Sequence, residues 1–182
     1  TYAKYLKAQS IDGSAQGSWI TAKLKALTAA KKLLGEAAYQ ARMGAHTGGA
    51  NGLFWIELSK SKIRGEVEIN NLNDIGKIKY KPVTMSVEED LIYPLLRGRD
   101  TQKWSTNPSL WIVLPQDPEK PNKAYDERVL QKKFPKTYEF LDCFRKELLI
   151  RTHYKAHFEK QGAPFYSIYN VGAYTLAPYK LV

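Results

Sequence analysis

The longest helical pattern in this chain runs over residues 125–161, between segments that alternate like strands. Proline cannot donate a backbone N–H inside a helix but fits its first turn, so we expect one helix to end near Phe134 and another to begin at Pro135. In the second helix, Leu141 and Leu148 belong to one apolar stripe, which predicts packing in the core. Because helices cluster here and do not alternate regularly with strands, the pattern predicts an α+β fold.

The remaining segments predict antiparallel hairpins and mixed strands. Strand-like patterns cover residues 53–58, the two arms of residues 59–83 about a turn at residues 71–74, residues 109–115 and aromatic segments of residues 164–182. An earlier helix is expected at residues 20–34, where Gly35 supplies a stop. A chain of 182 residues can bury roughly 70% of its unfolded surface, so we expect one compact domain over residues 1–182.

The two ends and the cysteine content bear on origin and compartment. The chain begins "TYAKYLKAQS", without a methionine or a secretory signal pattern, and ends "APYKLV" on a strand-like run. We therefore expect a segment excised from a longer protein. The single cysteine, Cys143, can form neither an internal disulfide nor a cysteine-based zinc site, which fits a cytoplasmic location. No apolar run approaches the ~18 residues of a membrane helix, so no membrane partner is expected.

The charge balance favours a polyanionic partner. The chain carries 28 lysines and arginines against 18 acidic residues, a formal net charge of +10. On a chain of this size such an excess favours nucleic acid, the commonest polyanion that proteins bind. The alternative is a merely basic protein whose lysines face solvent.

Two trios of basic residues alternate along the expected strands: Lys60, Lys62 and Arg64, and Lys77, Lys79 and Lys81. Period-two spacing places each trio on one face of its strand. A turn at residues 71–74 places Glu68 opposite Lys77, and the same register places Glu66 opposite Lys79. Opposite charges across a hairpin stabilise it, so these two lysines are interpreted as strand partners. Arg64 and Lys81 remain candidate contacts to a ligand.

Searches for catalytic and cofactor motifs find none. The glycine-rich loop over residues 44–52 lacks the Lys-Ser/Thr of a P-loop and precedes a strand where a dinucleotide fingerprint needs a helix. Its N–H groups could hold a phosphate or simply form a turn. His153 and His157 share a helix face but lack a third zinc ligand, so no metal is expected. Cys143 falls in an apolar stripe, where cysteine is usually an inert packing residue.

Two DNA-enzyme motifs are also missing from the chain. No acidic residue lies two positions before a lysine, as a common Mg²⁺-dependent nuclease motif requires. The catalytic Asn/Asp-Pro-Pro-aromatic motif of adenine methyltransferases has only a near miss at Asn107-Pro108, interpreted as a turn. We therefore expect neither catalytic nor cofactor-binding residues in this segment.

The run "YPLLRGRDTQKW" at residues 93–104 is the strongest candidate for a binding element. The planar guanidinium groups of Arg97 and Arg99 can take phosphate oxygens or a guanine edge in pairs, and Lys103 adds a third cation. Asp100 is expected to hold an arginine in place or to cap the following turn. For Trp104 we favour a core position over a stacking role, because it lies next to a strand start.

Four stretches, in order, resemble the TaqI-like specificity region of adenine-specific DNA methyltransferases: "ARMGAHTGGANGLFWIEL", "YPLLRGRDTQKW", "FPKTYEFLDCFRKEL" and "PFYSIYNVGAYTLAPYKLV". The resemblance covers roughly residues 18–182 and extends to single-chain restriction-modification enzymes of the type IIG kind. It implies a target-recognition domain that docks in the major groove of double-stranded DNA, opposite the catalytic methyltransferase domain of the same chain. The parent enzyme would flip out an adenine and methylate its amino group from S-adenosylmethionine; this segment itself would hold no cofactor.

Within that resemblance, Thr47, Gly48 and Asn51 match one shared motif, and Arg97, Gly98, Arg99 and Asp100 match another. Motifs common to enzymes with different targets are expected to serve phosphate positioning, structure or docking, while base readers lie in the variable stretches between them. Arg64, Lys81 and residues 120–123 are candidates for contacts in the groove or to the backbone. Substituting either arginine of the second motif with alanine should weaken binding to all sequences alike.

Two other functions remain open on the sequence alone. One is a basic protein-interaction module without a nucleic-acid role. The other is binding of single strands or RNA through Tyr166, Tyr169 and Tyr174, which requires these rings to be exposed as stacking platforms. We expect at least two of the three rings to lie in the core.

Overall fold

The computed structural model describes residues 5–33, 35–36, 38, 40–76 and 78–177, with the side chains of residues 60–63 also left out of the description. Its internal contacts divide the chain into two compact units, Thr1–Arg42 and Met43–Val182. A single recognition domain over residues 1–182 stays a prediction.

The first unit is a hairpin followed by a helix. Strands β1 (Lys7–Ser10) and β2 (Trp19–Ala22) pair antiparallel, and α1 (Leu24–Lys31) follows. The helix expected at residues 20–34 therefore begins later than predicted, because the β-branched pair of β2, Ile20 and Thr21, is used in the strand ladder with β1. Leu34, part of the same expectation, lies outside the described residues.

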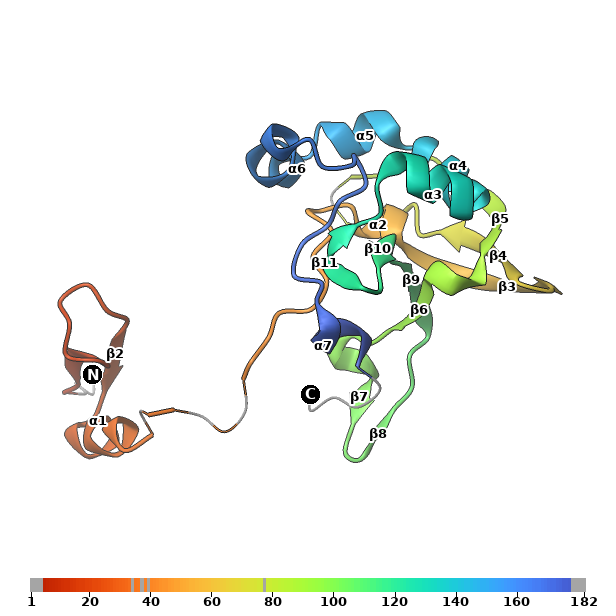
Figure 1. Cartoon of the computed structure of the whole chain (residues 1–182). Coiled ribbons are helices and arrows are strands. Elements are labelled where there is room, and N and C mark those ends of the chain that lie inside the picture. The colour runs from red at the N-terminus through yellow and green to blue at the C-terminus, as the bar shows by residue number, and fades with distance from the viewer. Residues whose placement is uncertain (1–4, 34, 37, 39, 77, 178–182) are drawn as a thin grey trace. The chain divides into compact units, whose positions relative to one another are not determined.

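An antiparallel sheet of five strands forms the centre of the second unit (Figure 1). Its strands are β3 (Trp55–Ile63), β4 (Glu66–Asn71), β5 (Thr84–Glu88), β6 (Ile92–Leu95) and β9 (Leu110–Val113), in the order β5-β4-β3-β9-β6. Two small ribbons accompany it: β7 (Thr101–Gln102) with β8 (Ser105–Thr106), and β10 (Gln116–Asp117) with β11 (Lys120–Ala124).

Most helices of this unit lie in its second half, which confirms the α+β prediction. The described helices of the unit are α2 (Asn51–Phe54), α3 (Glu127–Lys133), α4 (Pro135–Asp142), α5 (Arg145–Leu149), α6 (Thr152–His157) and α7 (Ala173–Leu176), with 3₁₀ turns η1 (Glu89–Leu91), η2 (Gly98–Asp100) and η3 (Glu159–Gln161). The predicted break holds: α3 ends before Phe134, and Pro135 is the first residue of α4. Figure 1 shows α3, α4 and α5 on one side of the sheet.

The core lies between these helices and the sheet. Leu141 and Leu148 are fully buried, as the apolar stripe predicted, and Phe144 of the same stripe meets Tyr80 edge-on with ring centroids 6.1 Å apart. Ile69 from the sheet is equally buried in the same cluster. Cys143 is partly buried against this core as a free thiol, which agrees with a packing role.

The predicted hairpin register about residues 71–74 is wrong. The strand β4 pairs instead with β3 across a turn at Arg64 and Gly65, where Gly65 has a φ of +79°. Glycine adopts a positive φ without strain, so Gly65 lets the chain reverse tightly between β3 and β4. Glu68 lies opposite Ser86 on β5, and Lys79 is outside every described strand; Lys77 lies outside the described residues.

The carboxylate of Glu88, in the sheet, caps the N-terminus of helix α4. Helix α4 has no capping side chain at its own N-terminus, and Glu88 of β5 accepts hydrogen bonds from the backbone N–H groups of Lys136 (3.0 Å) and Thr137 (2.8 Å). The Thr137 hydroxyl donates a third bond at 2.6 Å. Beside it, Lys136 forms an ion pair with Glu66, directly opposite Glu88 in the ladder. Burial raises the pKa of Glu88, but the hydrogen bonds that its carboxylate accepts lower this pKa by a larger amount, so the net shift is downward.

We expect Glu88→Gln to lower the free energy of unfolding at neutral pH by about 1 kcal/mol, a usual cost for losing a helix cap. A lowered folded pKa means that this stability is present above the unfolded pKa near 4.5 and is lost as the pH falls through the folded value. Urea unfolding from pH 7 to pH 3 should therefore show a shallower acid loss in the variant. Parallel curves for both proteins would contradict the assignment.

The aromatic tail differs from its strand prediction. Tyr169 forms a single bridge with His46, and the following residues turn into α7. Tyr166 is fully buried and donates its hydroxyl to the carbonyl of Tyr125 at 2.8 Å, which fixes it as a core residue. Tyr169 and Tyr174 are half-buried. These side chains pack against other parts of the unit, so the segment buries much of its apolar surface without joining a sheet.

Among the described residues, none of the helices combines the length and apolar character needed to cross a bilayer.

Candidate nucleic-acid interface

The glycine-rich loop exists as predicted, but its shared residues bond to one another. Gly48 and Gly49 have φ values of +68° and +92°, and the Thr47 hydroxyl donates to the Asn51 side-chain oxygen at 2.6 Å. Thr47 is only 2% exposed. This side chain is therefore placed to shape the loop, and Asn51 begins helix α2 directly behind it.

A buried arginine that the sequence reasoning missed holds this loop against the helices and the tail. Arg151 is 5% exposed and donates to four backbone carbonyls: Leu148 (2.9 Å), Thr47 (2.7 Å), Phe165 (2.8 Å) and Ser167 (3.0 Å). Burial lowers the pKa of Arg151 to about 10. Arginine gives five donors in a fixed fork, so one side chain can join segments that lie far apart in the sequence.

All three histidines of the chain lie beside this loop. The His46 and His153 rings are 5.1 Å apart, and those of His153 and His157 are stacked at 5.8 Å. Burial, and then the neighbouring His153, lower the pKa of His46. The His46 Nδ1 accepts from the Gly48 N–H at 3.0 Å, which ties the ring to the loop. Within the described part of the chain, no group of three potential ligands is arranged to hold a metal ion.

The "RGRD" motif forms a clamp at the base of the β7–β8 ribbon. Arg97 pairs with both oxygens of Asp100, Nε to Oδ2 at 2.8 Å and Nη2 to Oδ1 at 2.9 Å, and also donates to the Ser109 hydroxyl at 2.8 Å. The Arg97 backbone N–H donates to the same carboxylate at 3.0 Å. Asp100 thus holds an arginine, as expected, and it caps the turn η2 in which it lies, where a cap of the following turn was the expected alternative. The hydrogen bonds from Arg97 lower the pKa of Asp100. The Arg97 side chain is partly buried against Asp100, while Arg99 is exposed to solvent.

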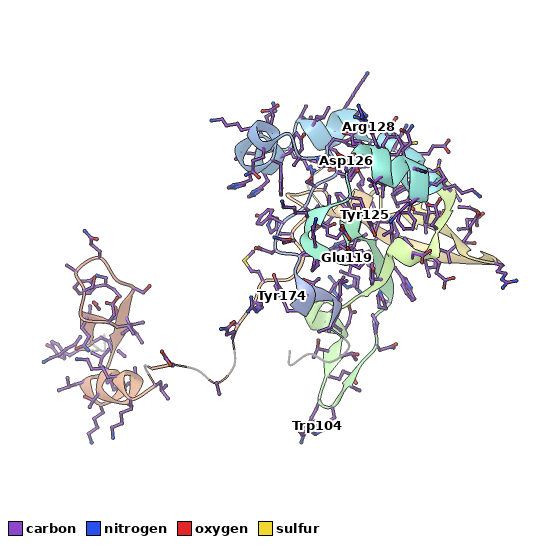
Figure 2. The ribbon with its side chains drawn as sticks, in the orientation of Figure 1. Trp104, Glu119, Tyr125, Asp126, Arg128 and Tyr174 are labelled. Carbon is purple, nitrogen blue, oxygen red and sulfur yellow. The ribbon has the colours of Figure 1, made fainter. Side chains whose placement is uncertain are left out.

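The β7–β8 ribbon extends from the Arg97–Asp100 clamp, and its tip is exposed to solvent. The Asp100 carbonyl accepts from the Asn107 N–H at 3.0 Å, and the two strands meet at a two-residue turn formed by Lys103 and Trp104. Trp104 is 93% exposed at a φ of +66°, so the expected core position is wrong. Figure 2 shows it at the end of the ribbon farthest from the sheet. The signal that was missed is local: "TQKWSTN" gives the ring no apolar neighbours to pack against.

The structure brings only part of the predicted set together. Lys103 lies at the tip of the ribbon, and Arg99 lies in η2 at its base, next to Arg97. Arg64 is exposed at the turn between β3 and β4, away from the ribbon in sequence and in the sheet order. Lys81 is exposed, with its Nζ 5.8 Å from the centroid of the Phe144 ring.

Residues 120–123 belong to β11, and two of them, Lys120 and Lys123, border an open groove of about 440 Å³. Its lining mixes charges: Asp117, Glu119 and Asp126 face the same space as Lys120, Lys123 and Lys133. The labelled Glu119, Tyr125 and Asp126 mark this region in Figure 2. Because acids and lysines alternate around it, the groove offers less attraction to a polyanion than the ribbon does.

The fold and these contacts define an α+β unit with a clamped basic ribbon. No protein-family model matches the chain, and neither a curated protein nor a solved structure matches it.

Proposed function

We propose that this chain is a double-stranded DNA target-recognition domain of an adenine-N6 DNA methyltransferase that uses S-adenosylmethionine, within a cytoplasmic restriction-modification or related defence system. The observation that carries the proposal is the clamped ribbon, which presents Arg99 and Lys103 to solvent on a chain with a net charge of +10. The motif resemblance supplies the enzyme class.

The ribbon fits the role physically. A two-stranded ribbon is narrow enough to enter the major groove of B-DNA, where base edges are exposed. The Arg97–Asp100 clamp sets its base rigidly, so that little ordering entropy is lost on binding. Arg97 then acts by positioning the ribbon, and Arg99 and Lys103 meet the phosphates.

The first unit offers a surface for the second expected partner, which is a catalytic domain of the same parent chain. Several of its apolar side chains are exposed: Trp19 by 61%, Leu24 by 57% and Leu33 by 88%. Exposed apolar groups of this size mark surfaces that pack against protein. We propose that this unit docks on the catalytic half while the ribbon reaches the DNA.

A fluorescence-anisotropy titration with a labelled random-sequence duplex, matched against a single strand, tests the proposal. At about 50 mM salt the protein should prefer duplex, and raising the salt to about 200 mM should cost a hundredfold or more in affinity if several phosphates are contacted. The double variant Arg99→Ala/Lys103→Ala should lose roughly tenfold at low salt and reduce the salt slope by about 2.

Lys132→Ala is the matched control, because Lys132 is an exposed lysine on α3 and its loss changes the net charge without touching the ribbon. It should bind like the parent protein. Since the control removes one positive charge and the double variant two, an equal loss of binding free energy per charge removed would show that net charge alone is sensed. Absence of duplex binding, together with saturable binding to an acidic protein, would favour the protein-interaction module instead.

A further inference from the structure

Trp104 is the most exposed tryptophan of the chain. Trp55 and Trp111 are partly buried against the core of the second unit, and Trp19 belongs to the first unit. Trp104 stands at the ribbon tip with 93% of its surface in solvent. It therefore contributes almost nothing to core packing, although an exposed indole favours association and aggregation.

The backbone at this position favours a different residue. A φ of +66° lies in the left-handed region, where bulky side chains are strained and glycine is not. Two-residue turns between strands commonly carry glycine or asparagine for this reason. Neither the turn nor the core accounts for an indole here, and strain kept at an exposed position points to function.

The surroundings of the ring indicate what it meets. Its neighbours along the ribbon, Gln102, Lys103 and Ser105, are polar and exposed, and Arg99 adds a cation at the base. A protein interface also surrounds its apolar centre with a polar rim, so polar neighbours by themselves fit either kind of partner. The charge of the neighbours decides: a flat aromatic ring near the exposed cations Lys103 and Arg99 matches a partner that combines phosphates with stacked aromatic bases.

We propose that Trp104 is a wedge that inserts its indole between bases of the bound duplex, at a step where stacking is weak. This inference rests on the proposed DNA-binding function and deepens it. Lys103 beside the indole neutralises the phosphates that flank the opened step, so the ring and the cations make separable contributions. Inserted apolar side chains of this kind unstack a base step and kink the duplex.

The test compares two duplexes that differ at one central position, one intact and one with an abasic tetrahydrofuran residue, which removes the cost of unstacking. The parent protein should bind the abasic duplex about tenfold or more tightly than the intact one, within the range of a single base–aromatic stack. Trp104→Ala should lose that preference, and Trp104→Phe should keep part of it. Arg99→Ala should weaken binding to both duplexes equally and leave the preference intact.

Two controls separate the wedge from effects on folding. Tyr5→Ala removes another exposed aromatic side chain, which is also 93% exposed, and should leave the preference unchanged. Trp104→Gly suits the positive φ, so its urea-unfolding midpoint should equal or exceed that of the parent protein while the abasic preference disappears. A lower midpoint together with a retained preference would assign the indole to the fold.

The outcomes also separate this inference from the proposed function. A parent protein that binds neither duplex removes both. Duplex binding with the same abasic preference in the parent protein and in Trp104→Ala overturns the wedge alone. A parent protein that binds the two duplexes equally, or a uniform loss in Trp104→Ala on both, likewise overturns the wedge and leaves DNA binding standing.

Discussion

Arg151→Met is expected to lower the free energy of unfolding by about 3–5 kcal/mol, among the largest effects of any single substitution in this chain. Methionine keeps much of the buried hydrocarbon volume but removes every donor, so the carbonyls of Leu148, Thr47, Phe165 and Ser167 lose the bonds that Arg151 gives them. A buried acceptor without a partner costs about 1–3 kcal/mol, and relaxation recovers part of the sum. Urea unfolding followed by far-ultraviolet circular dichroism measures the loss.

Arg128→Met is the matched control, because Arg128 is an exposed arginine on α3, labelled in Figure 2. It should change stability by no more than about 0.5 kcal/mol, as surface substitutions usually do. Arg151→Lys should fall between the two, since an ammonium has three donors and no planar fork. A methionine variant as stable as the control would mean that the four carbonyls find other donors, and the joining role of Arg151 would be wrong.

The sequence could not reveal Arg151, for a physical reason. Its role depends on carbonyl groups at residues 47, 165 and 167, whose proximity is a product of the completed fold. Local patterns carry no such signal, because any residue type supplies a backbone carbonyl. Pro135 shows the opposite case: its effect on the helix is contained in its own ring, and the predicted break between α3 and α4 is confirmed.

The errors at the hairpin and at Trp104 share one cause. The first prediction took a turn from its composition and the second took a core position from a neighbouring strand start, and both ignored what the flanking residues could pack against. Residues 71–74 looked like the turn, yet the alternation of buried residues in β4 is satisfied by pairing with β3 through Gly65. Trp104 was favoured as core because it lies next to a strand start, although its immediate neighbours are polar. For the candidate site, the motif singled out Arg97, Arg99 and Asp100 together, but only the geometry separates the Arg97–Asp100 clamp from the exposed cation Arg99.

Gly52→Ala is expected to destabilise the second unit by about 3 kcal/mol, the upper part of the usual range for overpacking. Gly52 is fully enclosed in α2, and a Cβ there would lie 2.5 Å from the Leu72 carbonyl oxygen and 2.8 Å from that of Ile75. Both obstacles are backbone atoms, so no side chain can rotate away. The turn at residues 72–75 must shift, and the hydrogen bond from Asn71 Nδ2 to the Gly52 carbonyl, now 3.2 Å long, must strain with it.

Gly98→Ala provides the control, since a Cβ at Gly98 meets nothing within 4 Å and the backbone there is compatible with alanine. It should leave the urea midpoint unchanged or slightly raised, because alanine restricts the unfolded chain more than glycine does. Comparing the two variants isolates the clash from the general cost of removing a glycine. Equal midpoints would show that the 72–75 turn yields freely, and the close approach of α2 to that turn would then contribute little to the stability of the unit that carries the ribbon.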